Sequence, residues 1–196
     1  MDLLVLCGGK GTRLAAISNG KQKCSMPING ISFVEHLLKN LSQQFIFDKI
    51  LFCVGHSSKD IVSLNIDPMV FNANEVHYIH EKIALGTGGA IKNALSLHNL
   101  SDVIMICNGD SICDINNLAE IYYNNGLLEN KGIIASAIPE KNNRYGSIIV
   151  DSDNHIISFK EKGEEKESKL INAGVYIFKK TILEQSFDKE SEACFS

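Results

Sequence analysis

The fold of this chain is decided close to its amino terminus, where residues 3–14 read LLVLCGGKGTRL. The apolar run 3–7 is too short for a helix and has the length of a buried strand. Three glycines follow within four positions, so the backbone there can turn sharply and approach another group closely. A strand that ends in such a turn is typical of α/β proteins, which bind ligands beyond the carboxyl ends of their strands.

The same alternation of short strands and helices continues outward from this stretch. Further strand-length apolar runs lie at 50–54, 76–79 and 103–107. Between the first two, apolar residues over 33–45 recur at three- and four-residue steps, and Ser32 with Glu35 forms a capping box at the start. We expect further helices from the Gly86–Gly89 turn onward and over about 115–128. The segment 58–74 is poorly patterned.

Strands and helices in this order predict the fold class. Parallel strands joined by right-handed crossovers give an α/β fold, a Rossmann-like open sheet that is mainly parallel with helices on both faces. After residue 119, strand-like runs follow one another without a long helix, which predicts a smaller antiparallel or mixed extension. These runs lie at 132–138, 147–150, 156–159 and 170–178. The charged segment 160–169 between them is expected to be a surface loop.

Length and composition limit the class of protein. The 196 residues are 44% hydrophobic, which suits one domain, 1–196, with a core that needs no disulfides. A net charge of −4 without any Lys/Arg run argues against nucleic acid or a membrane surface as partner. No signal peptide begins the chain, and no stretch approaches the roughly 20 apolar residues of a membrane helix. We therefore expect a soluble, cytoplasmic protein.

The six cysteines and the histidines carry no recognisable chemistry. The cysteines form no CxxC motif and four lie in or beside apolar runs, which favours reduced, mostly buried thiols over a zinc or redox site. His77 and His80 are three apart on a strand and point to opposite faces, so they are not expected to share a metal. No local signature of a hydrolase triad is present.

The glycine-rich turn over 8–11 has two interpretations. It could be a plain tight turn, or it could present backbone N–H groups to phosphate oxygens, with Lys10 and Arg13 adding charge-assisted bonds. It lacks the spacing of a Walker loop, and Leu14 occupies the third glycine position of the dinucleotide fingerprint. The glycines alone do not distinguish a plain turn from a phosphate-binding turn, so the neighbouring motifs are needed.

Those motifs resemble the sugar-1-phosphate nucleotidyltransferases, whose signature is GGxGTRL followed by PKxxxPxxG. The first half matches fully, and QKCSMPING at 22–30 keeps Lys23, Pro27 and Gly30 but has Gln22 in place of the first proline. Later blocks follow in the family order: EKIALGTGGAI at 81–91, NGDS at 108–111, RYGSI at 144–148, SFKEK at 158–162 and LINAGVYIF at 170–178. Among the branches, the blocks are most similar to the D-glycero-D-manno-heptose 1-phosphate guanylyltransferases of bacterial surface-polysaccharide pathways.

The resemblance implies a reaction between two polyanions. A sugar 1-phosphate, with heptose 1-phosphate favoured, attacks a nucleoside triphosphate, with GTP favoured, and pyrophosphate leaves. Cations and positioning supply the catalysis and no protein nucleophile is needed. Arg13, Lys23 and Asp110 are the expected catalytic residues, with Arg13 as a two-pronged phosphate ligand and Lys23 as a point charge. Asp110 is also the expected Mg²⁺ ligand.

The matching blocks also imply two halves, 1–118 for nucleotide and 119–196 for sugar phosphate. The expected nucleotide-binding residues are Cys7, Gly8, Gly9, Gly11, Thr12, Arg13, Lys23, Glu81, Gly86, Thr87 and Gly88. The expected sugar-phosphate-binding residues are Gly109, Tyr145, Gly146, Glu161, Lys162, Asn172 and Gly174. Taken alone, Lys23 and Lys162 could be solvated lysines, Asp110 could cap a turn, and Gly174 could mark a bulge.

The chain departs from the family after the last block. The late D-[IVT]-G-[TV] block, which supplies a second metal carboxylate, is missing, so the chain looks truncated at its C-terminus. Asp188 and Glu190 are candidate substitutes without the flanking glycine. Three alternatives follow: a truncated sequence, Mg²⁺ held by Asp110 and substrate phosphates, or a catalytically weak nucleotide-binding regulatory protein. The same reaction with another base or sugar phosphate is a further alternative, and a homo-oligomer is a possible assembly.

Overall fold

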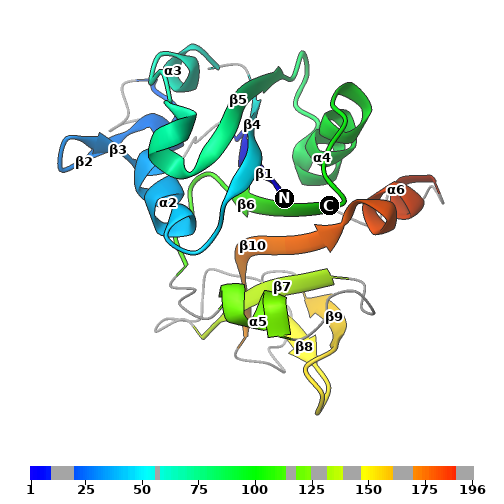
Figure 1. Ribbon diagram of the computed structural model, residues 1–196. Coiled ribbons are helices and arrows are strands. Elements are labelled where there is room, and N and C mark those ends of the chain that lie inside the picture. Colours follow the sequence, from blue (N-terminus) through cyan, green and yellow to red (C-terminus); the bar gives the residue numbers. More distant parts are fainter. Residues whose placement is uncertain are drawn as a thin grey trace.

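A six-stranded sheet forms the centre of the computed structural model, which describes residues 1–9, 20–55, 58–113, 118–124, 132–138, 147–160 and 170–188. Its strands are β1 (Asp2–Cys7), β4 (Phe47–Val54), β5 (Ala73–His80), β6 (Val103–Asn108), β7 (Gly132–Ala137) and β10 (Ile171–Lys179). Their order is β5-β4-β1-β6-β10-β7, as Figure 1 shows. The first four are parallel, and β10 is antiparallel to both β6 and β7. The predicted mixed, mainly parallel sheet is confirmed.

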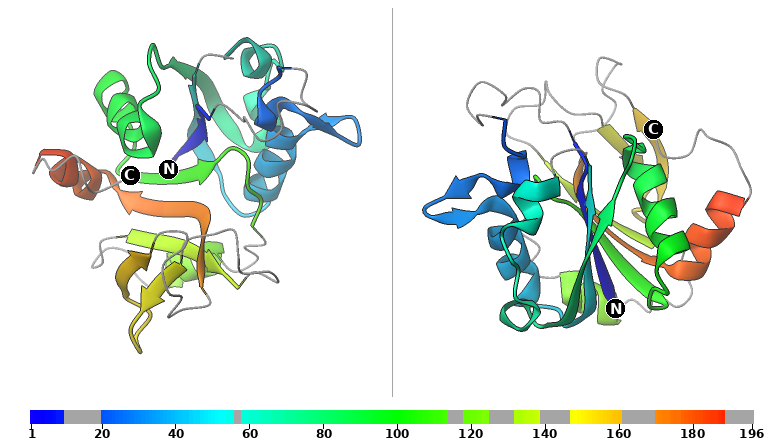
Figure 2. Two further views of the ribbon diagram at one scale, coloured as in Figure 1. Left: turned by 180° about the vertical axis from the view of Figure 1, so that it is seen from behind. Right: turned by 90° about the horizontal axis from the view of Figure 1, so that it is seen from above.

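Helices cover both faces of this sheet, as predicted. Leu3 and Val5 of β1 pack on one face with α2 (Phe33–Ser42), whereas Leu4 packs on the other with α4 (Gly86–Leu97) and α6 (Lys180–Asp188). Figure 2 shows α2 on one side of the sheet and α4 with α6 on the other. Burial of each such leucine or valine side chain stabilises the fold by about 1.5–3 kcal/mol. The alternation of strand side chains therefore builds two cores from one sheet.

Helix α2 begins where the sequence predicts. The Ser32 hydroxyl accepts a hydrogen bond from the Glu35 N–H at 3.3 Å, and Glu35 Oε2 accepts one from the Ser32 N–H at 3.0 Å. This reciprocal pair is the predicted capping box. The predicted strands 50–54 and 76–79 begin three residues earlier in the structure, because polar residues such as Asp48 and Lys49 interrupt the apolar pattern at that end.

Shorter elements complete the described chain. The poorly patterned segment 58–74 contains α3 (Ser58–Val62) and the 3₁₀ helix η3 (Pro68–Phe71), which are too short to show helical periodicity. Within the predicted helix 115–128, the structure describes α5 (Leu118–Asn124). The chain also forms two hairpins. One, β2 (Pro27–Ile28) with β3 (Ile31–Ser32), was not predicted, whereas the other, β8 (Ser147–Val150) with β9 (Ile156–Lys160), confirms the predicted strands 147–150 and 156–159. The expected loop 160–169 is corrected at its first residue, which ends β9; residues 161–169 lie outside the described chain.

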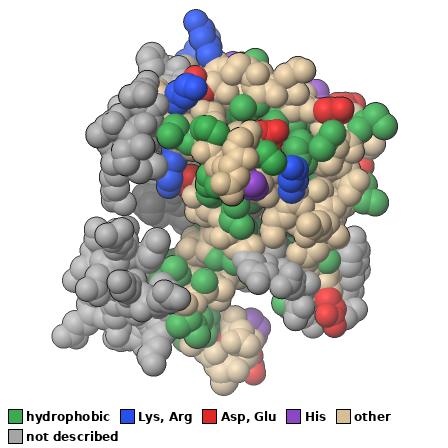
Figure 3. Space-filling model, turned by 90° about the vertical axis from the view of Figure 1, so that its left-hand side faces the viewer, with side chains coloured by type: hydrophobic (Ala, Val, Ile, Leu, Met, Phe, Trp, Pro, Cys, Tyr) green, Lys and Arg blue, Asp and Glu red, His purple; other side chains and the backbone are tan. Residues whose placement is uncertain are grey.

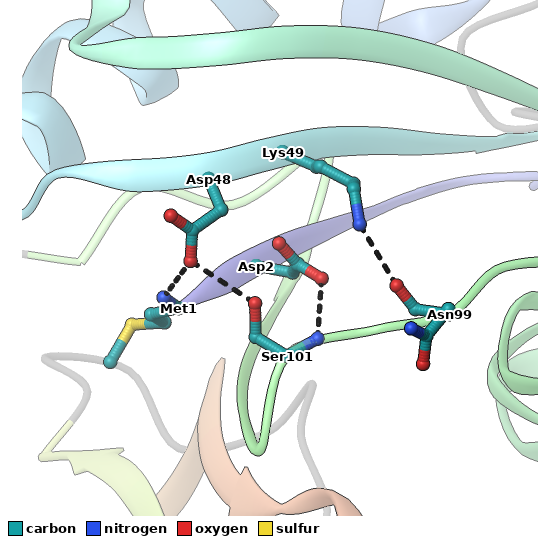
Figure 4. A network of polar contacts seen from close by, with 6 residues as sticks. All are labelled: Met1, Asp2, Asp48, Lys49, Asn99 and Ser101. Carbon is teal, nitrogen blue, oxygen red and sulfur yellow. Dashed lines mark hydrogen bonds and ion pairs between the residues drawn. The ribbon is translucent and has the colours of Figure 1, made fainter.

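A polar network ties the amino ends of the strands together (Figure 4). Asp48 Oδ2 accepts from the Met1 ammonium at 2.6 Å and from the Ser101 hydroxyl at 3.1 Å. Asp2 accepts from the Ser101 N–H at 2.7 Å, and Lys49 donates to the Asn99 carbonyl at 2.8 Å. The ammonium is the main reason that the pKa of Asp48 lies below its ordinary value. The network links β1, β4 and the segment that precedes β6.

The thiols behave as the sequence predicts within the described residues. Buried thiols that form no disulfide are found at Cys7, Cys24, Cys53 and Cys107, and Cys113 is half-buried. Cys194 lies outside the described residues. Burial raises the pKa of Cys53 to about 12, which keeps that thiol protonated and unreactive at neutral pH. None of the described helices is long and apolar enough to cross a bilayer.

Candidate active site

A cavity of about 390 Å³ opens at the carboxyl ends of β1, β5 and β6. This is where an open α/β sheet is expected to bind its ligand. The predicted site residues that line it are Cys7, Gly8, Gly9, Lys23, Glu81, Gly86, Thr87, Gly109 and Asp110. They come from four separate segments of the chain, which the sheet brings together.

Lys23 and Asp110 meet at this cavity although 87 positions separate them in sequence. The Lys23 ammonium donates to Asp110 Oδ2 at 2.7 Å. Their side chains are 41% and 46% exposed, so the pair contributes only about 0–1 kcal/mol to stability. Both charges face solvent at the cavity and are therefore available to a ligand. On the face drawn in Figure 3, described basic and acidic side chains are interspersed rather than gathered by sign.

The lysine sits on a firmly held turn. It opens the 3₁₀ helix η2 (Lys23–Ser25), in which the Gln22 carbonyl accepts from the Ser25 N–H at 3.0 Å and from the Ser25 hydroxyl at 2.8 Å. The Gln22 N–H donates to Asp60 of α3 at 2.8 Å. Hydrogen bonds at its N–H and at its carbonyl thus fix the backbone of Gln22, the residue that precedes Lys23.

Asp110 reaches the cavity because Gly109 allows a close approach between two strand ends. The Gly109 N–H donates to the Leu6 carbonyl at 2.9 Å, which holds the turn after β6 against the end of β1. A Cβ on Gly109 would lie 2.6 Å from Cys7 Sγ and 3.0 Å from the Leu6 carbonyl oxygen. A side chain at this position would therefore force the turn, and Asp110 with it, to move.

The glycine turn after β1 lies against Glu81. A Cβ on Gly8 would lie 3.2 Å from a Glu81 carboxylate oxygen, and one on Gly55 would lie 2.9 Å from the Gly8 carbonyl oxygen. Glu81 is positioned in turn by its backbone, which donates to the Val54 carbonyl at 2.9 Å, and by the Leu85 N–H, which donates to its carboxylate at 3.3 Å. An acidic acceptor is therefore fixed beside the turn, among the residues that the sequence predicts to bind the nucleotide.

Helix α4 contributes its amino terminus to the cavity wall. Gly86 and Thr87 line the cavity, and Leu85 at the N-cap has no side-chain acceptor for the first helical N–H groups. Such groups carry partial positive charge and bind anions or carbonyl oxygens. The predicted residue Gly88 is buried within α4 and is not among the lining residues.

The second half of the chain approaches the cavity through β10. Gly174 has φ +77°, and a Cβ there would lie 2.6 Å from Asn108 Nδ2, so this glycine lets β10 pass close to a lining residue. Asn172 does not line the cavity. Its side-chain oxygen accepts from the Gly174 N–H at 2.8 Å and its nitrogen donates to the Tyr176 hydroxyl at 2.6 Å.

The remaining predicted site residues lie outside the described chain: Gly11, Thr12, Arg13, Tyr145, Gly146, Glu161 and Lys162. Sequence reasoning did not select other lining residues, among them Gln22, Cys24, Ala84, Ala90 and Asn108. Gln22 is 6% exposed and its Oε1 has no hydrogen-bond partner among the described residues. Its place beside Lys23, where the family signature has proline, is the one signal that could have drawn attention to it.

The donor set fits a magnesium ion that is shared with phosphates. Asp110 offers a hard carboxylate at the cavity, and Glu81 is the other acidic residue among those that line it. Mg²⁺ keeps several waters and commonly binds one or two protein carboxylates together with substrate phosphates. Asp188, a candidate substitute for the missing carboxylate, ends α6, which packs beside α4, and does not line the cavity. Glu190 lies outside the described residues.

A glycine turn, a helix amino terminus, a cation and a carboxylate thus meet at the carboxyl edge of an open α/β sheet. Together they define a nucleotide-binding α/β protein, because each of them is a partner that phosphate or its bound metal prefers.

Comparison with known proteins identifies the family. The sequence model described as Nucleotidyl transferase matches residues 3–194, so the chain belongs to this family and is a nucleotidyltransferase. The chain is 36% identical to the D-glycero-alpha-D-manno-heptose 1-phosphate guanylyltransferase of Campylobacter jejuni, over 93% of this chain and 77% of that protein. It is 30% identical to the mannose-1-phosphate guanylyltransferase of Mycobacterium tuberculosis, over 94% of this chain and 50% of that protein. The resemblance to the sugar-1-phosphate nucleotidyltransferases is confirmed.

Solved structures agree with this assignment. HddC from Yersinia pseudotuberculosis complexed with GMP-PN is 32% identical, with a TM-score of 0.75 over 93% of this chain and 78% of that one. The inositol-1-phosphate CTP transferase from T. maritima, at 14% identity and a TM-score of 0.77 over 95% of this chain and 74% of that one, shares the fold. The fold predicted from the sequence is that of known nucleotidyltransferases.

Proposed function

We propose that this chain joins GTP to a heptose 1-phosphate, giving a GDP-heptose and pyrophosphate for surface-polysaccharide synthesis. The convergence of Lys23 and Asp110 at the cavity is the observation that carries the proposal. Two guanylyltransferases among the relatives and the GMP-PN complex of HddC support the base, and the name of the Campylobacter protein supports the sugar.

The reaction needs charge neutralisation and alignment. A phosphate oxygen of the sugar 1-phosphate attacks the α-phosphorus of GTP in line, and the bond to pyrophosphate breaks. The Gly8–Gly9 backbone and the start of α4 bind acceptor atoms of the nucleotide, while Lys23 neutralises the negative charge that moves onto the leaving group. Arg13 is proposed to grip the triphosphate beside it. Mg²⁺ supplies further neutralisation when bound, and Asp110 is the residue that would hold it.

We propose that the first half of the chain binds the nucleotide and that the second half binds most of the sugar phosphate. The residues that line the cavity fall between 6 and 110, which supports a nucleotide site within 1–118. We assign the sugar phosphate to 119–196 together with Gly109, and its ligands to Tyr145, Gly146, Glu161, Lys162, Asn172 and Gly174. A cytoplasmic location and a homo-oligomer are part of the same proposal.

The test is a substrate matrix with pyrophosphate release as the readout. Purified protein is incubated with Mg²⁺, each of GTP, ATP, CTP, UTP and dTTP, and each of heptose, mannose and glucose 1-phosphates. We expect turnover with GTP and heptose 1-phosphate and little with the other pairs. Omission of Mg²⁺ or addition of EDTA should abolish the signal.

Two other outcomes have distinct meanings. Turnover with another base or sugar phosphate would replace the substrates and keep the reaction. GTP binding, measured by calorimetry, without pyrophosphate release from any pair would instead support a nucleotide-binding regulatory protein.

A further inference from the structure

The turn that presents Lys23 is held from outside the cavity by Asp60. Asp60 Oδ2 accepts a hydrogen bond from the Gln22 N–H at 2.8 Å, in a partly buried contact between α3 and the start of η2. Asp60 is not among the residues that line the cavity. A carboxylate that accepts from a backbone N–H makes one of the stronger hydrogen bonds in proteins. Asp60 therefore restrains the residue next to Lys23 without touching the ligand space.

The backbone of Gln22 has the conformation that a proline would impose. Its φ is −67° and its ψ is 137°, and the proline ring locks φ close to −65°. A proline at this position would restrain φ by its ring but would have no N–H to donate. Gln22, which stands at the proline position of the signature quoted above, has no such ring. The hydrogen bond to Asp60 is available because residue 22 keeps its N–H.

We propose that Asp60 is a positioning residue for Lys23, and that its hydrogen bond to the Gln22 N–H takes the place of the proline ring. The proposal rests on the proposed function in that Lys23 acts on the phosphates. Asp60 holds Gln22 at one end, the Ser25 N–H and hydroxyl hold its carbonyl at the other, and Lys23 follows directly. Without Asp60, the ammonium would lose its fixed place opposite Asp110.

The test compares Asp60→Ala in two backgrounds, the natural chain and the Gln22→Pro variant. In the natural chain we expect Asp60→Ala to lower kcat roughly tenfold, since small misplacements of a catalytic group cost rate. Asp60→Asn keeps a side-chain oxygen that can accept the same bond and should recover most of the loss. In the Gln22→Pro background, whatever its own activity, Asp60→Ala should cause no further loss because the donor is gone.

Hydrogen exchange supplies a readout that needs no substrate. In Asp60→Ala, amides of the peptide that spans 22–26 should exchange several-fold faster than in the natural chain. In Gln22→Pro, the same substitution should leave the exchange of that peptide unchanged. Asp67→Ala is the matched control, because Asp67 also accepts from a backbone N–H, that of Met69, at the start of η3.

The outcomes separate the two proposals. An unchanged kcat and unchanged exchange in Asp60→Ala, or an equal loss in both backgrounds, would overturn the role of Asp60. The role of Asp60 would also be refuted if Asp67→Ala lowered kcat as much as Asp60→Ala while the two variants had equal melting temperatures. Absence of pyrophosphate release from the natural chain would refute the proposed function alone, and the exchange data would then decide the role of Asp60.

Discussion

At the scale of single residues, Lys23 and Asp110, which we propose to carry the chemistry, contribute little to the stability of the fold. Each side chain is nearly half exposed, and an exposed ion pair contributes little to stability. Gly109 and Gly174 differ from them, because a side chain at either position would collide with neighbouring atoms, so packing requires glycine there in addition to the proposed place of both residues in the sugar-phosphate site. Substitutions at the two kinds of position should therefore separate activity from stability.

Lys23→Ala should abolish most activity and leave the fold intact. We expect pyrophosphate release to fall on the order of 100-fold or more, since removal of one preorganised charge contact to a transition state commonly costs that much. The melting temperature should stay nearly unchanged. Lys39→Ala, which removes an exposed lysine from the last turn of α2, is the control and should affect neither. A large fall in melting temperature for Lys23→Ala would show that the lysine is structural.

Gly109→Ala should have the opposite effect and destabilise the fold. The new Cβ would lie 2.6 Å from Cys7 Sγ, so the turn after β6 would have to move. Overpacking of this kind costs about 1–3 kcal/mol, which urea unfolding measures directly. Gly9→Ala is the control for stability, because a Cβ at Gly9 meets no atom of the described residues within 4 Å. Equal unfolding midpoints for the two variants would contradict the packing argument.

At the scale of elements, the length and capping of a helix determine whether the sequence predicts it. Helix α2 has ten residues, a capping box and a regular apolar stripe, so its start could be predicted. Helix α3 has five residues and only Ile61 buried, and no periodic pattern can develop over so short a length. Yet α3 supplies Asp60, which accepts a hydrogen bond from the residue before Lys23, so an element without a sequence signal can still contact the segment that lines the cavity.

Ser32→Ala tests the capping box of α2. Loss of the hydroxyl leaves the Glu35 N–H without its acceptor and should cost about 1 kcal/mol. For a chain of this size, that corresponds to a fall of about 2–4 °C in the melting temperature. Ser42→Ala at the other end of α2 is the matched control, since its hydroxyl donates to the Lys39 carbonyl and caps no N–H group. A similar fall in both variants would show that the cap is not the cause.

At the scale of the whole molecule, the carboxyl ends and the amino ends of the strands carry different groups. The carboxyl ends of β1, β5 and β6 open onto the cavity, whereas the amino ends of β1 and β4 carry the network of Asp2, Asp48 and Ser101. We propose that substrates bind at the carboxyl ends, whereas the polar contacts at the amino ends link β1, β4 and the segment that precedes β6. Stability and catalysis should accordingly respond to pH through different groups.

Asp48→Asn should reduce the dependence of stability on acid pH. The pKa of Asp48 is lowered in the folded protein, chiefly by the Met1 ammonium, so its contribution is present above the ordinary carboxyl pKa. It is lost as the pH falls through the lowered value. We therefore expect Asp48→Asn to be less stable than the natural chain at pH 7, with the difference shrinking below about pH 4. Urea midpoints at low salt measure it, and a difference that stays constant with pH would contradict this account.

The sequence alone predicted the main alternation of strands and helices, the two-faced sheet, the start of α2 and the family, but not α3, α6 or the β2–β3 hairpin. Each predicted feature depends on local spacing, since period and caps are properties of neighbouring residues. The resemblance predicted that Lys23 and Asp110 share a site, but their direct ion pair and the contact of Gly109 with Cys7 were decided only by the tertiary structure. So was the bond from Asp60 to Gln22. Those contacts join segments that the chain separates by tens of residues, and only the packing of the sheet sets the distances between them.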